Sequence, residues 1–274
     1  MPADAARSAP ACYDGLRVIP ISDDNPTLRT PVVTLGLLLA IAAAWVLAQG
    51  AGLDARRLMA SVCNLGMVPG ELTGAAKLGT ALPIGAGMAC VVDNQPVNWL
   101  TPLTSMFLHG GWAHIIGNSL FLWVFGNNIE DSMGRLRFLA FYLACGLAGA
   151  AAQVAIDPSS PIPVVGASAA ISGVMGAYLV LYPRVSVNML FIFIIIVRII
   201  PLPAWAVLIY WFALQVIGVL PQLAGPQAEP AGGVAFMGHV GGFVAGLVLV
   251  KLFEDRRLVD VRTRTRHRLH PDHF

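Results

Sequence analysis

The sequence Gly166-Ala167-Ser168-Ala169-Ala170-Ile171-Ser172-Gly173 opens an apolar segment with a row of small residues. A second apolar segment begins with Gly238-His239-Val240-Gly241-Gly242. Ionisable side chains are costly in hydrocarbon, so a histidine in such a segment is a candidate functional residue. Small residues four positions apart allow two helix backbones to approach closely in lipid. We therefore expect the two segments to pack together and to bring Ser168 and His239 into contact.

The small residues recur at that spacing on both segments. They are Gly238, Gly242 and Gly246 on the second, and Ser168, Ser172 and Gly176 beside Ala169, Gly173 and Ala177 on the first.

The composition is that of a polytopic membrane protein. The 274 residues are 57% hydrophobic and only 12% charged, and the mean hydropathy is +0.72. A soluble domain of this size rarely reaches such values. The formal net charge of +2 is too small to indicate a nucleic-acid partner.

We predict an all-α membrane protein with six spans, each close to the length needed to cross a bilayer. The spans are Pro31–Gly50, Trp112–Ile129, Phe138–Ile156, Ala167–Tyr182, Ala204–Leu220 and Val234–Phe253. The segment Asn188–Ile200 is apolar but short, which favours an interfacial or re-entrant segment over a span.

The arginines support the same count. They cluster before span one, between spans two and three, between spans four and five, and after span six. With six spans all four groups lie on one side of the membrane, as the positive-inside rule expects. Residues 1–30 then form a flexible cytoplasmic arm, 31–255 the membrane domain, 51–111 a large outer loop, and 256–274 a basic cytoplasmic tail. The arm shows no cleavable signal peptide, and Glu130 and Arg137 are expected to pair across a turn at Gly134.

The residue types in the apolar segments exclude two kinds of catalytic site. A carboxylate pair would need aspartates inside spans, and a zinc site would need a motif such as His-Glu-x-x-His; the sequence has neither. A hydroxyl nucleophile activated by imidazole remains, with Ser168 and His239 in those roles. We expect no metal and no cofactor.

Acyl transfer also needs donors for an oxyanion. His114 and Asn118 lie one turn apart at the start of the second span and share a face, so both can point at that oxygen. His109 is off that face and is expected to structure the loop above it. An alternative is that His114 and Asn118 bond only to loop backbone.

These residues and their order resemble the rhomboid intramembrane serine proteases, from about Asp23 to Phe253. The matching motifs are Asp24 to Thr27, Thr104 to Gly110, His114-x-x-x-Asn118, Gly126 to Glu130 with Gly134, Gly166 to Ser168, Leu181 to Arg184, and Gly238-His239. Two positions depart from the family pattern: Ala169 replaces the usual glycine after the serine, and Ser172 stands where some members place an aromatic ring against the histidine.

The resemblance implies a serine endopeptidase with a Ser168–His239 dyad and an oxyanion hole made by His114, Asn118 and the Ser168 amide. It also implies a six-helix fold, a water-filled cavity open to the non-cytoplasmic side, and a gate near the fifth helix. The substrates would be single-span membrane proteins cut within the bilayer. A bacterial plasma membrane with both termini in the cytoplasm is the expected location, while the oligomeric state stays open.

Two other functions remain open: a non-catalytic relative that binds transmembrane helices, and a small transporter or channel. Cys63 and Cys90 share the outer loop, and the sequence leaves open whether they form a disulfide.

Overall fold

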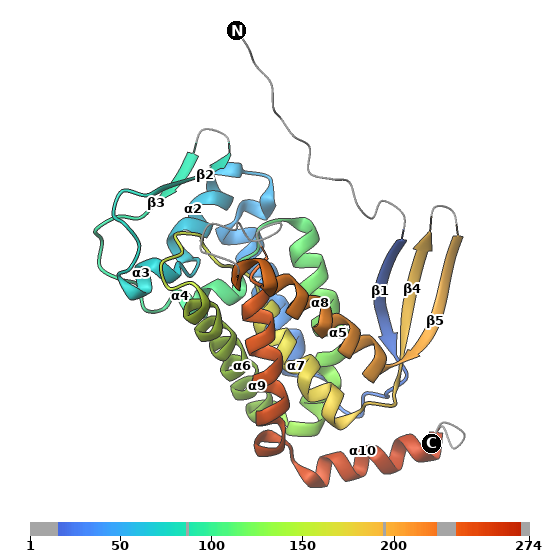
Figure 1. The fold of residues 1–274 in the computed structure, drawn as a ribbon. Helices are drawn as coiled ribbons and strands as arrows, with labels where there is room; N and C mark the ends of the chain where they lie inside the picture. Colours follow the sequence, from blue (N-terminus) through green and yellow to red (C-terminus); the bar gives the residue numbers. More distant parts are fainter. Residues whose placement is uncertain (1–15, 86–87, 194–195, 224–233, 270–274) are drawn as a thin grey trace.

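The computed structural model describes residues 16–85, 88–193, 196–223 and 234–269. It is mostly helical, with a helical bundle, a region of short helices and a hairpin at one end (residues 51–111, the outer region) and a small sheet at the side (Figure 1). The elements are β1 (Leu16–Asp23), α1 (Val32–Ala43), α2 (Ala55–Leu65), α3 (Pro69–Thr73), β2 (Ala81–Gly85), β3 (Met88–Val91), α4 (Thr101–Thr104), α5 (Trp112–Met133), α6 (Arg135–Ile156), α7 (Ser168–Leu181), β4 (Ser186–Phe193), β5 (Ile196–Pro203), α8 (Ala204–Leu223), α9 (Phe236–Phe253) and α10 (Arg256–Leu269).

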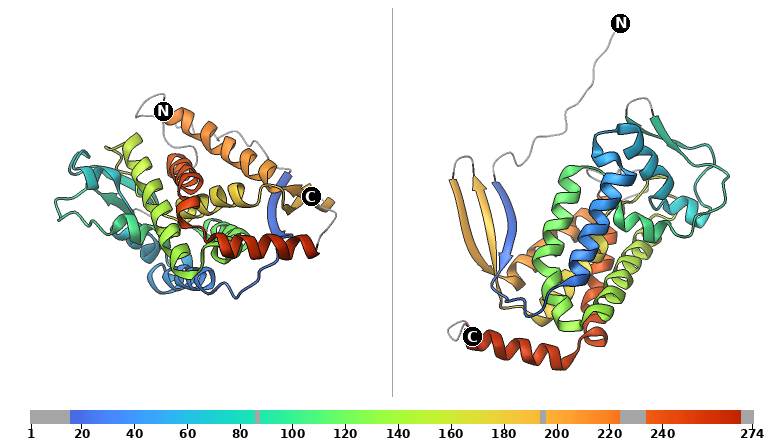
Figure 2. Two further views of the ribbon diagram at one scale, coloured as in Figure 1. Left: turned by 90° about the horizontal axis from the view of Figure 1, so that it is seen from below. Right: turned by 180° about the vertical axis from the view of Figure 1, so that it is seen from behind.

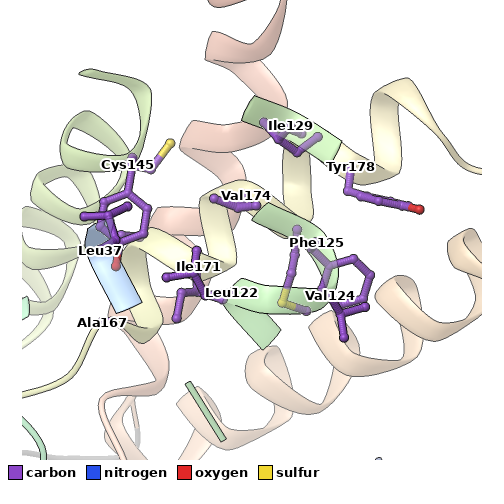
Figure 3. Close-up of a cluster of buried hydrophobic side chains, with 14 of the residues drawn as sticks. Leu37, Leu122, Val124, Phe125, Ile129, Cys145, Ala167, Ile171, Val174 and Tyr178 are labelled. Atoms are coloured by element: carbon purple, nitrogen blue, oxygen red, sulfur yellow. The ribbon is translucent and has the colours of Figure 1, made fainter. Parts of the chain in front are cut away.

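Helix α7 lies at the centre of the bundle, between α5, α6 and α9, while α1 packs outside α5 and α8 lies at the edge beside α9 (Figure 2). The apolar core joins α1, α5, α6 and α7 through side chains such as Leu37, Phe125, Cys145 and Val174 (Figure 3). The central helix α7 is rich in small residues, and its first residue, Ser168, is partly buried by the helices around it.

Glycines determine how closely α7 and α9 approach. A Cβ built on Gly242 would lie 2.0 Å from the carbonyl oxygen of Ala169, and one on Gly246 would lie 2.0 Å from that of Gly173. The two contacts advance by four residues on each helix, so α7 and α9 run in the same direction. The predicted packing of the two small-residue segments is confirmed.

By length and composition, three helices among the described residues can cross a membrane: α6, α8 and α9. The segments Val32–Ala48 and Ser168–Leu181 are apolar but shorter. These apolar helices are those of an integral membrane protein. Helix α5 meets α6 through Gly134, whose φ of +79° is readily adopted by glycine and permits the turn.

The prediction of an all-α protein is wrong in two places. Strands β1, β4 and β5 form an antiparallel sheet in the order β1-β4-β5, and β2 pairs with β3 in the outer region. The predicted flexible arm therefore contains a strand, since Leu16–Asp23 pairs along β4; residues 1–15 lie outside the described part. The physical reason is the short apolar run Val18-Ile19-Pro20-Ile21 with its β-branched side chains, which an average over the polar arm hides, together with the pairing along β4.

The segment Asn188–Ile200 lies in a β-hairpin. Ser186 pairs with Pro203, so the chain leaves the end of α7 and returns to the same end before α8 begins. The prediction that this segment does not form a spanning helix holds, whereas its strand structure was missed. Its six isoleucines and one valine favour strands over helices.

The expected pairing of Glu130 with Arg137 is also wrong. Glu130 instead accepts hydrogen bonds from the amides of Val33 and Thr34, at 2.9 and 2.8 Å, at the start of α1. Arg137 lies 3.9 Å from the carboxylate of Asp255. A carboxylate satisfies the unpaired amides of a helix N-terminus better than water does in this buried position.

In the outer region Cys63 of α2 and Cys90 of β3 form a disulfide. The bond ties the β2–β3 hairpin to α2. Residues 51–111, predicted as an outer loop, thus contain α2, α3, α4 and this hairpin.

Candidate active site

Ser168 and His239 meet at the ends of their helices. Nε2 of His239 lies 2.7 Å from Oγ of Ser168, which is hydrogen-bonding distance. The contact depends on the parallel, glycine-lined packing of α7 and α9, because it places the first turns of the two helices at the same level. A hydroxyl and an imidazole held in this way are the components of an activated nucleophile.

Gly166 brings the backbone before Ser168 close to two other polar side chains. Its φ is +126°, and a Cβ at this position would lie 2.6 Å from Nε2 of His114 and 3.5 Å from Nδ2 of Asn118. Glycine is therefore required both by conformation and by space. The amide of Gly166 is bonded to the carbonyl of Ser105 at 2.9 Å, which fixes the turn.

His114 presents an N–H group toward this turn. Its Nδ1 lies 3.3 Å from the amide of Gly110 and accepts that proton. In a neutral imidazole the other nitrogen then carries the hydrogen, so Nε2–H of His114 faces Gly166. The loop bond considered as an alternative role therefore exists, and it leaves the second nitrogen available as a donor.

Asn118 is oriented by His109. Nδ2 of Asn118 lies 2.9 Å from Nε2 of His109, and the amide nitrogen has a second hydrogen for another acceptor. His109 is fully buried, and its backbone makes two bonds with the side chain of Gln49 at 2.8 and 2.9 Å. Burial, with a smaller effect of the charge of His114, lowers the pKa of His109 to about 4. His109 is therefore neutral near pH 7 and can accept the Asn118 proton.

These groups face one cavity of about 600 Å³. Its lining includes Ser168, His239, His114 and Asn118, together with the apolar side chains of Met106 and Trp211. The cavity is bordered by small residues of α6, Gly146 and Gly149. It thus combines a hydroxyl, an imidazole and two N–H donors with an apolar wall. Among the described residues no group of three or more His, Cys, Asp or Glu side chains lies together as a metal site.

The two positions that depart from the family pattern are accommodated by their surroundings. A Cβ on Gly149 would lie 2.7 Å from the methyl group of Ala169, so the methyl fits because residue 149 is glycine. Oγ of Ser172 donates to the carbonyl of Ser168 at 2.6 Å, within its own helix. The rings near His239 are instead Trp211 of α8 and Phe236 of α9, with ring centroids 5.9 and 6.5 Å from that of His239.

Sequence reasoning missed three side chains that support the site. Gln215 of α8 lies 2.8 Å from Nδ1 of His239, and Gln153 of α6 accepts a hydrogen bond from the amide of Gly238 at 3.1 Å. His109 is the third: the sequence placed it in the loop, but its contact with Asn118 was not predicted. The signal was present for the two glutamines, because a polar amide inside an apolar segment needs a partner.

The comparisons with known proteins agree with this mostly helical fold. The model of the rhomboid domain matches residues 96–255, more than half of the chain. This chain belongs to the rhomboid family.

Two relatives come from Bacillus subtilis. "Rhomboid protease GluP" is 44% identical over 81 residues, which cover 30% of this chain and 15% of that relative. "Putative rhomboid protease YdcA" is 35% identical over 81 residues, which cover 30% of this chain and 40% of that relative.

"Rhomboid protein 1, mitochondrial" of Saccharomyces cerevisiae is 27% identical over 148 residues, which cover 53% of this chain and 39% of that relative. The chain therefore spans less than half the length of each of these three relatives.

Proposed function

We propose that this protein is an intramembrane serine endopeptidase that cuts transmembrane segments of single-span membrane proteins. The observation that carries the proposal is the 2.7 Å contact between Ser168 and His239 at one end of the cavity. Relatives named as rhomboid proteases support the same class of reaction.

The reaction would run in two halves. Oγ of Ser168 attacks the scissile carbonyl carbon while Nε2 of His239 takes the hydroxyl proton. The tetrahedral intermediate loses the amine, which receives that proton from His239, and an acyl-enzyme remains. Water then attacks the ester while His239 takes a proton from it. The second intermediate breaks its bond to Oγ of Ser168, which receives that proton from His239, and the carboxylic acid and the free serine result.

The oxyanion of each tetrahedral intermediate would be bound by N–H groups. Nε2–H of His114 and the second N–H of Asn118 face the turn that precedes Ser168. Donors fixed before the reaction stabilise the developing charge without reorganising at that moment. No cofactor is needed for these steps.

The proposed orientation follows from charge. Six spans, with α1, α5, α6, α7, α8 and α9 as the spanning helices, would place α10 and the arginine groups in the cytoplasm and the cavity on the other side. We expect a bacterial plasma membrane, with the bilayer as the protein's surroundings and no nucleic-acid partner.

The test is conversion of a model single-span substrate by the purified full-length chain in liposomes. Wild type should release two fragments, and Ser168→Ala should lower turnover by at least about a thousand-fold. Equal, unmeasurable turnover of both would favour the non-catalytic relative that binds transmembrane helices.

A further inference from the structure

Gln215 of α8 is bonded to the second nitrogen of the His239 ring. Oε1 of Gln215 lies 2.8 Å from Nδ1 of His239, while Nε2 of Gln215 donates to the carbonyl of Trp211 at 3.3 Å. A carbonyl oxygen only accepts, so the amide nitrogen must face Trp211 and the amide oxygen must face the imidazole. The opposite orientation would bring two acceptors together.

This orientation determines the protonation pattern of the neutral ring. Because Oε1 only accepts, Nδ1 of His239 must carry the hydrogen. Nε2 then has a lone pair, and this is the nitrogen that lies 2.7 Å from Oγ of Ser168. The tautomer that can take the serine proton is the one that Gln215 selects.

Packing between α8 and α9 holds Gln215 in reach. Phe212 stacks on Phe243 at 4.5 Å between ring centroids. Because Gly218 has no side chain, the ring of Phe236 packs directly against its backbone. Gln215 itself is only 8% exposed. A buried amide among apolar side chains is costly unless it is paired, and both of its ends are paired here.

We propose that Gln215 is the positioning residue of the site: it fixes the tautomer and the ring orientation of His239 as an uncharged third member beside Ser168 and His239. The role rests on the proposed function. Unlike an aspartate in a triad, an amide aligns the ring without adding a negative charge. The base is thus held by a helix that carries neither the nucleophile nor the base.

The test combines a spectroscopic and a kinetic measurement on the full-length protein. Nitrogen-15 NMR of labelled histidine distinguishes protonated from unprotonated ring nitrogens, and His239 is assigned by comparison with His239→Gln. Wild type should show Nδ1–H alone. Gln215→Leu should show a mixture of both tautomers, whereas Ser168→Ala should keep the wild-type pattern, because the amide and not the serine selects it.

The kinetic measurement uses the model single-span substrate. Gln215→Leu should lower kcat about ten- to a hundred-fold with little change in KM, since a misaligned base affects the chemical step. Gln215→Glu retains an acceptor oxygen and should recover kcat to within about tenfold of wild type. Leu214→Ala, on the exposed face of the same helix, is the control for a general weakening of α8.

Two failures are distinguishable. Unchanged tautomer and unchanged kcat in Gln215→Leu, with an active wild type, would overturn the role of Gln215 and leave the proposed function standing. A fixed tautomer in wild type that is lost in Gln215→Leu, without cleavage of any substrate by the wild type, would support the role of Gln215 and overturn the protease function.

Discussion

The two ends of the bundle bury polar groups in opposite ways. At the end with Ser168 and His239, the contacts described above pair uncharged groups around an open cavity. At the other end, where α10 lies across the bundle (Figure 1), the buried groups carry formal charges and fill the space between helices. In the proposed function the first end transfers protons, whereas the contacts of the second end hold segments of the chain together.

Arg262 is the centre of the charged end. Its side chain is 1% exposed, and Nη1 lies 2.7 Å from the carboxylate of Asp131 on α5. It also donates to Asn128 and lies over the ring of Tyr182 at 5.2 Å. Asp131 in turn accepts from the amide of Leu28 at 2.7 Å. One ion pair therefore joins α10, α5, α7 and the segment before α1.

The comparison predicts that changes at the two ends will affect different quantities. Of the substitutions that test this comparison, Asn118→Ala is expected to have the largest effect, because it removes a proposed oxyanion donor. Turnover should fall about ten- to a thousand-fold, while the midpoint of thermal unfolding changes little. Steady-state kinetics on the model substrate measures the first quantity and thermal unfolding in detergent the second. Unchanged turnover in folded protein would remove Asn118 from the site.

Arg262→Ala should show the reverse pattern. Removing the arginine leaves the buried carboxylate of Asp131 with only the half-exposed Arg29, 3.4 Å away, as its cation. The loss of the buried partner should cost up to about 3 kcal/mol of stability. Turnover per folded molecule should stay near the wild-type value. Arg264→Ala, an exposed arginine two residues along the same helix, is the matched control and should unfold like wild type. Equal midpoints for the two variants would show that the buried ion pair does not hold the helix.

A pH effect on stability is expected from His109. Because its pKa falls from 6.5 to about 4 in the fold, the unfolded chain binds the proton more readily. The contribution of His109 is therefore present above pH 6.5 and is lost as the pH falls toward 4. His109→Gln, which keeps an acceptor for Asn118, should show a shallower loss of thermal stability over this range. Parallel curves for the two proteins would argue against a buried neutral histidine.

The smallest effect on stability is expected for Asp23 at the charged end. Its dependence on pH is opposite in sign to that of His109. Burial raises its pKa from 3.8 to about 6, although hydrogen bonding from Tyr178 and the charge of Arg262 oppose the rise. The folded protein then retains a proton that the unfolded chain releases, so the contribution of Asp23 is lost as the pH rises through about 6. Asp23→Asn should flatten the stability curve between pH 4 and 7. A steeper curve in the variant would contradict this sign.

Much of the bundle was predictable because it depends on patterns within single segments. The apolar runs, the glycine spacing of residues 238–246 and the shared face of His114 and Asn118 are local signals, and they lead to the observed packing of α7 on α9. The roles of the four candidate residues remain proposals, although the structure places their side chains around one cavity.

The features that the sequence did not predict depend on contacts between residues far apart in the chain. Strand β1 forms only because β4, some 170 residues later, pairs with it, as Leu16 does with Phe193. Gln215 and Arg262 likewise acquire their roles from residues on other helices, so neither position alone identifies its partner. A polar residue in an apolar segment signals that a partner exists, without saying which.

The most direct test of the central claim is labelling of the purified protein with a fluorophosphonate, which reacts with activated serine hydroxyls. Mass spectrometry of the labelled peptide identifies the residue that was modified. The account predicts modification of Ser168 in the wild-type chain, and a rate at least about a thousand-fold lower in His239→Ala. Modification of a different serine, or the same rate of Ser168 labelling without His239, would contradict it.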